Sequence, residues 1–128
     1  MGIKIIFKNN DLKEFHKLYM EFIRFLQNEY PLKRDIKIEF LKEREGSMST
    51  GARTKDSTLK VLTKGRLNRD ILRTLAHEWI HEYQMTILNR EMGPNIGGQN
   101  EDEANAISAQ LIKMFEKFYP EKEKFMYE

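Results

Sequence analysis

The sequence predicts an α+β fold in which a small, twisted, mostly antiparallel sheet packs against three helices. Three observations lead to this prediction. Three segments carry apolar residues at the spacing of a helix with one buried face. Residues 35–42 alternate between apolar and charged side chains, which is typical of a half-exposed strand. Two further short segments, rich in β-branched residues, predict additional strands.

The composition indicates one domain. The chain has 128 residues, 40% of them hydrophobic, which suffices for one core, so we expect a single domain over residues 1–128. The absence of cysteine excludes disulfides, cysteine-ligated zinc and thiol catalysis. A formal net charge of +2 gives no strong signal for nucleic acid. No apolar run is long enough for a signal peptide or a membrane span, so we expect no membrane partner and a cytoplasmic location.

The first part of the chain reads as strand, helix and strand. Residues 3–7 form the first expected strand, and the polar residues 9–11 end it and offer a helix cap. Apolar residues then recur at helical spacing from residue 12 until Pro31 ends the helix. The next strand is the alternating segment "DIKIEFLK" at residues 35–42, and we expect it to pair in an antiparallel manner.

A hairpin is expected next. The segment "GSMSTGARTKDS" is weakly patterned, whereas "TLKVLTKG" at residues 58–65 reads as a strand, so the two predict a hairpin. The weaker segment is the candidate edge strand of the sheet.

Two helices complete the chain. The second helix is expected over residues 68–89, with Asn68 as its cap and with Gly93 and Pro94 as its stop. The third is expected over about residues 100–118. For the charged tail "EKEKFMYE" we weigh a cover over the functional cleft against a frayed end, and chain termini are more often frayed.

The middle of the second helix carries the motif "HEWIH". Its histidines, His77 and His81, are four residues apart, so they sit one helical turn above each other and their imidazoles can converge on one ion at about 2.0–2.1 Å. Glu78 follows the first histidine and is positioned to take a proton from a water on that metal. The motif therefore predicts a metal site with Glu78 as general base.

An ordinary surface helix is the alternative interpretation, since histidines four apart are usually solvated. The neighbouring residues favour the metal. One face of the helix is apolar and lies roughly opposite the histidines; it consists of Leu72, Leu75, Ala76, Trp79, Tyr83 and Ile87. Met85 and Leu88 are apolar on the histidine side as well, so we expect another element to cover that side.

Two histidines are too few for a catalytic zinc site, so a third ligand is needed. His16 has no partnering motif, and we interpret it as structural. The third helix opens with "NEDEANAISAQLI", in which Glu101 projects near the buried stripe whereas Glu103 is rotated about 200° away. Glu101 is therefore the preferred ligand and Glu103 the less favoured one. Capping of the helix by Asn100 and Glu103 is the non-functional alternative for this acidic cluster.

The motif "HEWIH", followed about twenty residues later by "EDEAN", resembles the gluzincin metallopeptidases. It is similar to ImmA/IrrE-like domains and to small HExxH proteins found in phage genomes, and the resemblance covers residues 58–114. It implies a zincin-like fold and one Zn²⁺ per chain, held by His77, His81 and Glu101. It also implies that Asn105 steadies a ligand histidine, where many relatives have aspartate. Because an asparagine lends no negative charge, we expect it to raise ligand basicity less.

The resemblance further implies that an exposed edge strand binds substrate by backbone pairing. The candidate lies in residues 47–54, where the side chains are small. The residues proposed to contact substrate are Ser47, Met48, Ser49, Thr50 and Gly51. An edge hairpin that binds nothing is the alternative.

The expected function is zinc-dependent hydrolysis of peptide bonds, with a peptide or protein as substrate. Glu78 would activate the water and pass the proton to the leaving amine. The alternative is a metal-stabilised binding or regulatory protein of the same fold with little or no activity. A DNA-associated protease is a third possibility, which the balanced charge disfavours. The sequence identifies no group that stabilises the oxyanion, since Tyr83 lies on the apolar stripe, where core packing is favoured.

Overall fold

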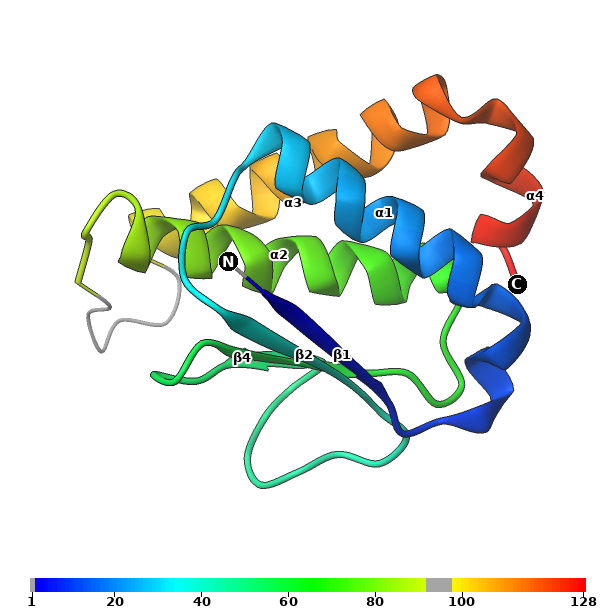
Figure 1. The fold of residues 1–128 in the computed structure, drawn as a ribbon, viewed down its shortest axis with the longest axis horizontal. Helices are drawn as coiled ribbons and strands as arrows, with labels where there is room; N and C mark the ends of the chain where they lie inside the picture. The colour runs from blue at the N-terminus through cyan, green and yellow to red at the C-terminus, as the bar shows by residue number, and fades with distance from the viewer. Residues whose placement is uncertain (1, 92–97) are drawn as a thin grey trace.

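Four strands and four α-helices occur in residues 2–91 and 98–128, which are the residues that this computed structural model describes. In chain order they are β1 (Ile3–Phe7), α1 (His16–Glu29), β2 (Ile36–Leu41), β3 (Gly51–Arg53), β4 (Thr58–Leu62), α2 (Asn68–Thr86), α3 (Gln99–Phe118) and α4 (Glu123–Met126). Short 3-10 turns, Asn10–Phe15 and Pro120–Lys122, precede α1 and α4. The three long helices lie on one side of the sheet, which confirms the α+β class (Figure 1).

The sheet is mixed, with the strand order β1-β2-β4-β3. β2 is parallel to both β1 and β4, and only β3 and β4 pair in an antiparallel manner. The expectation of a mostly antiparallel sheet is therefore wrong. Side chains alternate in the same way along parallel and antiparallel strands, so alternation does not reveal strand direction. The direction follows from α1, which carries the chain back across the sheet before β2 begins, as parallel neighbours require.

The two faces of the sheet differ as the alternation of β2 predicts. Ile38 and Phe40 are fully buried beneath the helices. On the opposite face, Glu39 lies 3.6 Å from Lys8 and 3.9 Å from Lys37, so charged pairs line that side. The expected hairpin is also confirmed, since β3 pairs with β4 and forms an edge of the sheet.

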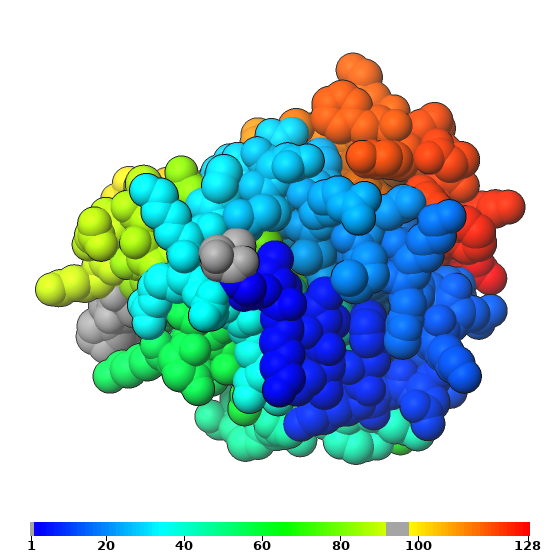
Figure 2. Space-filling model, viewed as in Figure 1, coloured from blue at the N-terminus to red at the C-terminus, as the bar shows by residue number. Residues whose placement is uncertain are grey.

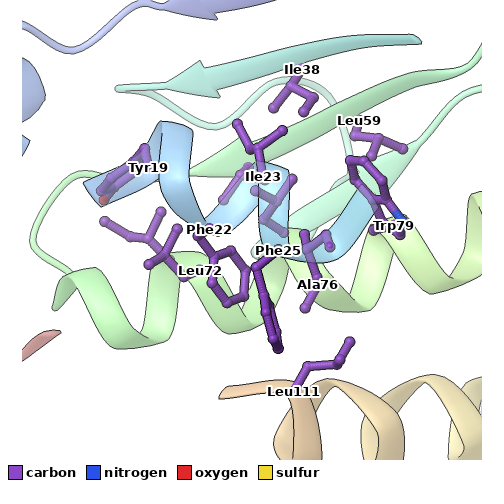
Figure 3. Close-up of a cluster of buried hydrophobic side chains, with 14 of the residues drawn as sticks. Tyr19, Phe22, Ile23, Phe25, Ile38, Leu59, Leu72, Ala76, Trp79 and Leu111 are labelled. Carbon is purple, nitrogen blue, oxygen red and sulfur yellow. The ribbon is translucent and has the colours of Figure 1, made fainter. Parts of the chain in front are cut away.

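The core lies between the sheet and the helices. Figure 3 shows aromatic and aliphatic side chains of α1 packed over α2, next to residues of the sheet and of α3. Trp79 of α2 is fully buried, and its indole N–H donates to the carbonyl of Tyr30 at 2.9 Å. Because α2 is buried against this core on one face, only its other face is available for a functional site.

The C-terminal segment is docked and not frayed. Met126 is fully buried, and the Phe125 ring packs edge-on against Phe15, with ring centroids 6.5 Å apart. In Figure 2 this segment, in red, adjoins the blue segment that precedes α1. The expectation of a frayed tail is thus wrong, because the segment contributes an apolar residue to the core.

The start of α2 also differs from the expectation. Asn68 is the first residue of the helix and does not cap it; its side chain accepts a hydrogen bond from the Tyr19 hydroxyl at 2.7 Å and donates one to the Phe125 carbonyl at 2.9 Å. The backbone N–H of Asn68 instead donates to the carbonyl of Glu128. The first turn of α2 is therefore joined to the C-terminal segment.

The end of α2 comes at Thr86, before the expected residue 89. Asn89 has φ 55°, the left-handed conformation that turns the chain away from a helix axis. Gly93 and Pro94, which the sequence suggested as the stop, lie outside the described residues. Within the described ranges, no helix is long and apolar enough to cross a membrane.

Candidate metal centre

Three side chains from two helices converge on one point. His77 and His81 project from the same face of α2, and Glu101 projects toward them from the first turn of α3. The two oxygens of the Glu101 carboxylate each lie 2.9 Å from an imidazole nitrogen, Oε1 from His77 Nε2 and Oε2 from His81 Nε2. The two Nε2 atoms are 3.1 Å apart. This convergence is the feature on which the site is built.

A buried glutamine orients the second histidine. Gln84 Oε1 lies 2.9 Å from His81 Nδ1, and the Gln84 amide nitrogen donates to the backbone carbonyl of Asn100 and to the Glu103 carboxylate. Since the amide nitrogen is committed to two acceptors, the amide oxygen must accept the proton of His81 Nδ1. With a proton on Nδ1, the uncharged form of the ring presents a lone pair on Nε2 toward His77 and Glu101.

Gln84 has no role that the sequence alone predicts. One signal was available, because Gln84 is three residues beyond His81 and so lies on the helix face that was expected to be covered. A polar residue on a covered face needs hydrogen-bond partners. Its partners come from the start of α3, which the sequence does not place.

The donor atoms fit a small cation. Two unprotonated imidazole nitrogens and a carboxylate all offer lone pairs, so they repel one another unless a cation or shared protons lie between them. A tetrahedral ion with bonds of about 2.0–2.1 Å separates its ligand atoms by roughly 3.3 Å. The two histidine nitrogens are 3.1 Å apart, and each lies 2.9 Å from a different oxygen of Glu101. With one ligand atom from each residue, all three atoms lie within 4.8 Å of one another, a spacing that small side-chain rotations bring to this value.

The environment keeps His77 neutral. Burial lowers the pKa of this imidazole below its ordinary value, and the neighbouring His81 acts in the same direction. Glu101 and Asn105 act against this, and both line the same cleft as His77. Asn105 therefore stands beside a candidate ligand histidine, the position expected for it from the sequence. A neutral imidazole is the form that binds a metal.

Glu78 is buried beside this cluster. Its side chain is nearly inaccessible, and burial raises the pKa of its carboxyl to about 8 in the metal-free protein. The negative charge of Glu101 adds to the rise, and the cation of Arg53 opposes it. A carboxyl with a pKa near neutrality is able to take up and release a proton under physiological conditions.

A cleft of about 440 Å³ opens in front of these residues. His77, Glu78 and Glu101 line it, so the candidate metal ligands and the candidate base face the same space. α2 and α3 supply two of its walls, and the chain around β3 supplies the third through Ser49, Thr50 and Gly51. A volume of this size is in the range of small-ligand sites.

The edge strand β3 leaves backbone groups free at this wall. On either side of β3, Leu62 N–H donates to the Thr50 carbonyl and Thr54 N–H to the Thr58 carbonyl, so the even-numbered residues of 50–54 are the ones that bond to β4, with Ala52 opposite Lys60. In an antiparallel ladder the intervening residues, Gly51 and Arg53, then point their N–H and C=O groups to the open edge. Of the residues suggested as a substrate strand, Ser49, Thr50 and Gly51 line the cleft. Ser47 and Met48 are not among its lining residues.

Gly51 allows this strand to approach α2 closely. A methyl group in its place would lie 2.6 Å from Thr74 Cγ2 and 2.9 Å from Glu78 Oε2. Only a residue without a side chain fits here, so the distance between the edge strand and Glu78 depends on Gly51.

The less favoured ligand, Glu103, is directed elsewhere. It lies 2.8 Å from Arg90 and also accepts from Gln84, and these two hydrogen bonds hold the pKa of its carboxyl below the ordinary value. The capping box, which was the non-functional alternative for this cluster, is not formed, because Gly98 precedes α3 as its N-cap and the Asn100 side chain accepts from Arg90. The acidic cluster thus separates into one residue at the histidines and one that supports Gln84.

Two other residues considered from the sequence lie away from the cleft. The His16 ring stacks on Phe7 with centroids 3.7 Å apart, in agreement with a structural role. Tyr83 packs edge-on against Tyr30 with centroids 5.2 Å apart and does not line the cleft. The expectation that Tyr83 belongs with the core residues is confirmed.

Comparisons of the chain with protein-family models, with curated proteins and with solved structures gave no match.

Proposed function

We propose that the protein is a zinc-dependent peptide hydrolase in which His77, His81 and Glu101 hold one Zn²⁺. The observation that carries the proposal is the convergence of two imidazole nitrogens and a carboxylate within 3.1 Å of one another, beside the buried carboxyl of Glu78. The proposal includes a zincin-like fold and a gluzincin-like active site. When bound, zinc would supply a Lewis acid that polarises a carbonyl and makes water more acidic.

The residues around the metal would each have a separate role in hydrolysis. Glu78 would accept a proton from the attacking water at its carboxylate and later donate it to the leaving amine nitrogen. The free backbone groups of Gly51 and Arg53 would bind the peptide as an added strand and so orient its scissile bond along the cleft. Gln84 would hold the His81 ring in place, and Asn105 would support His77.

A metal-stabilised binding or regulatory protein with the same site is the second candidate. One observation favours it: the described residues that line the cleft include no tyrosine and no histidine other than His77. Such side chains commonly stabilise the oxyanion of acyl transfer, and without one we expect the rate to be low. The position of the buried Glu78 carboxyl next to the candidate ligands favours the hydrolase, since a structural zinc site needs no base.

The test measures metal and turnover on the same samples. Wild-type protein purified without added zinc should contain about one zinc per chain. Glu78→Gln should retain that zinc and lose hydrolysis of a quenched fluorescent peptide library by at least about 100-fold.

Three results would contradict this expectation. Wild-type protein that takes up no zinc even when supplied with it rules out the metal centre. Zinc without turnover in the wild type excludes the hydrolase and leaves the binding protein. Equal turnover in wild type and Glu78→Gln points to a contaminating peptidase.

A further inference from the structure

Within residues 2–91 and 98–128, no hydrophobic side chain lines the cleft beside the candidate metal centre. The twelve described residues that line it are polar, charged or glycine. Ligand sites are usually lined mainly by apolar and aromatic residues, which bind apolar side chains of a substrate. A polar lining of this kind selects a ligand by charge and hydrogen bonding.

Two arginines occupy the end of the cleft that lies toward the start of α2. Arg73 is exposed and precedes His77 by four residues, which places it on the same helix face about 6 Å along the axis. Among the described residues Arg73 forms no ion pair, whereas Arg69, one turn earlier, is paired with Glu116 at 3.3 Å. Arg73 lines both this cleft and a smaller neighbouring hollow that it shares with Lys113, and no ion pair within the described residues occupies its guanidinium, which is available to an anion in the cleft.

Arg66 supports the same end of the cleft from beneath. Its guanidinium is held by three neutral acceptors, the backbone carbonyls of Leu62 and Asp70 and the hydroxyl of Thr74. Burial lowers the pKa of this guanidinium, and within the described part of the chain no carboxylate forms an ion pair with it. The exposed Asp70 is the nearby negative charge that acts on Arg66, but it forms no ion pair with it, so this fixed, partly desolvated cation favours an incoming anion.

The negative groups of the cleft do not cancel these charges. Glu101 is engaged by two histidine nitrogens, and Glu78 lines the cleft next to His77, five residues along α2 from Arg73. Asp70 is exposed and lies at the same end, but it forms no ion pair with either arginine in the described residues. An anion of the substrate would therefore meet an arginine pair with one unpaired carboxylate nearby.

We propose that Arg73, supported by Arg66, forms a carboxylate-binding subsite about one helical turn from the candidate metal centre, and that the ligands of this cleft are acidic peptides. This subsite rests on the proposed function, because a bound peptide is a substrate only if the protein is a hydrolase. Binding of an anion by Arg73 does not itself require turnover. The carboxylate has two possible sources, an Asp or Glu side chain or the free carboxyl terminus of a peptide. Both present the planar oxygen pair that a guanidinium binds with two hydrogen bonds.

The test measures binding to protein that is not required to cleave. Zinc-loaded Glu78→Gln protein is titrated by calorimetry with an acetylated, amidated hexapeptide of alanine and serine that carries one glutamate, and with its glutamine counterpart. A third peptide, uncharged in its side chains, has a free carboxyl terminus. We expect at least one carboxylate peptide to bind about tenfold more tightly than the uncharged peptide.

Two further variants assign the preference to a residue. Arg73→Gln in the same background should reduce the tenfold preference to about one. Arg24→Gln removes the same charge from an exposed position of α1, outside the cleft, and should leave the preference intact. Preference for the side chain or for the terminus supports the subsite and identifies the carboxylate source.

Other outcomes overturn the subsite. These are equal binding of all three peptides, no binding of any up to millimolar concentration, or an unchanged preference in Arg73→Gln. The proposed hydrolase is judged separately from wild-type turnover. Selective binding with no turnover would keep the subsite and reject the hydrolase, whereas turnover without acidic preference would do the reverse.

Discussion

His81 and Gln84 are joined by a hydrogen bond between two buried side chains, with His81 Nδ1 2.9 Å from Gln84 Oε1. Because the Gln84 amide is itself fixed by Asn100 and Glu103, the bond sets both the ring orientation and the tautomer of His81. The start of α3 thus acts on the candidate metal centre twice, directly through Glu101 and indirectly through Gln84.

Gln84→Ala should weaken zinc binding by about 10–100-fold, because His81 loses the acceptor that orients it. Competition with a chromophoric chelator measures the affinity. Gln110→Ala, the same substitution at an exposed position of α3, serves as the control and should leave the affinity unchanged. Equal affinity of Gln84→Ala and wild type would show that the orientation of His81 does not depend on Gln84.

Glu101 and Glu103 offer a matched pair two residues apart. Glu101→Gln removes the carboxylate that lies 2.9 Å from both histidines, so zinc content after dialysis should fall well below one per chain. Glu103→Gln should retain zinc, since Glu103 is bound to Arg90 and Gln84. The metal is quantified by atomic emission. Loss of zinc in Glu103→Gln but not in Glu101→Gln would mean that Glu103, and not Glu101, is the zinc ligand.

Glu78 should lower the stability of the metal-free protein as the pH rises from about 4.5 to about 8, while the lowered pKa of His77 acts in the opposite direction below about pH 6.5. In that window folded Glu78, with its pKa raised to about 8, retains a proton that the unfolded chain has already released. At this group the folded state then binds more protons than the unfolded state, so the free energy of unfolding falls with rising pH. A pKa shift of this size corresponds to roughly a few kcal/mol.

Glu78→Gln removes this titration. In chelator-treated protein the variant should be more stable than the wild type at pH 8.5 and similar to it near pH 4, as measured by urea denaturation at each pH. A constant difference between the two proteins across this range would mean that Glu78 titrates normally in the folded state.

Gly51→Ala should destabilise the protein by about 1–3 kcal/mol, because the added methyl group would lie 2.6 Å from Thr74 Cγ2. Thermal or urea unfolding measures the loss. Adding Thr74→Ser removes that methyl group of Thr74 and should recover part of the stability. If the double variant is no more stable than Gly51→Ala, contact with Thr74 is not the cause.

The ion pair between Arg53 and Glu82 fastens the edge strand to α2. Arg53 Nε lies 2.6 Å from Glu82 Oε1, and Glu82 is fully buried, with Ser57 donating to its second oxygen. Arg53→Met leaves that carboxylate buried without its cation and should cost about 3–5 kcal/mol of unfolding free energy.

The double variant Arg53→Met with Glu82→Leu should be substantially more stable than Arg53→Met alone, since it no longer buries an unpaired charge. Denaturation of the single and double variants provides the comparison. Additive losses would mean that the two side chains act independently.

Much of the candidate site follows from local spacing. Residues four apart on a helix share a face, so the sequence alone places His77 above His81 and orients both away from the core stripe. The same arithmetic separates Glu101 from Glu103 on α3. It does not reveal Gln84, Arg66 or Arg73, because their roles depend on which element lies opposite them.

The sequence by itself determined where the three long helices and the main strands lie, although not their exact ends, and which face of each is apolar, because these depend on periods of 3.6 and 2 residues. Only the tertiary structure decided that β2 runs parallel to its neighbours, that the C-terminal segment docks through Met126, and that Glu101 meets the two histidines. An apolar face indicates that another segment must cover it, but it does not identify that segment. That choice is made by contacts between segments far apart in the chain, all formed together when the core closes.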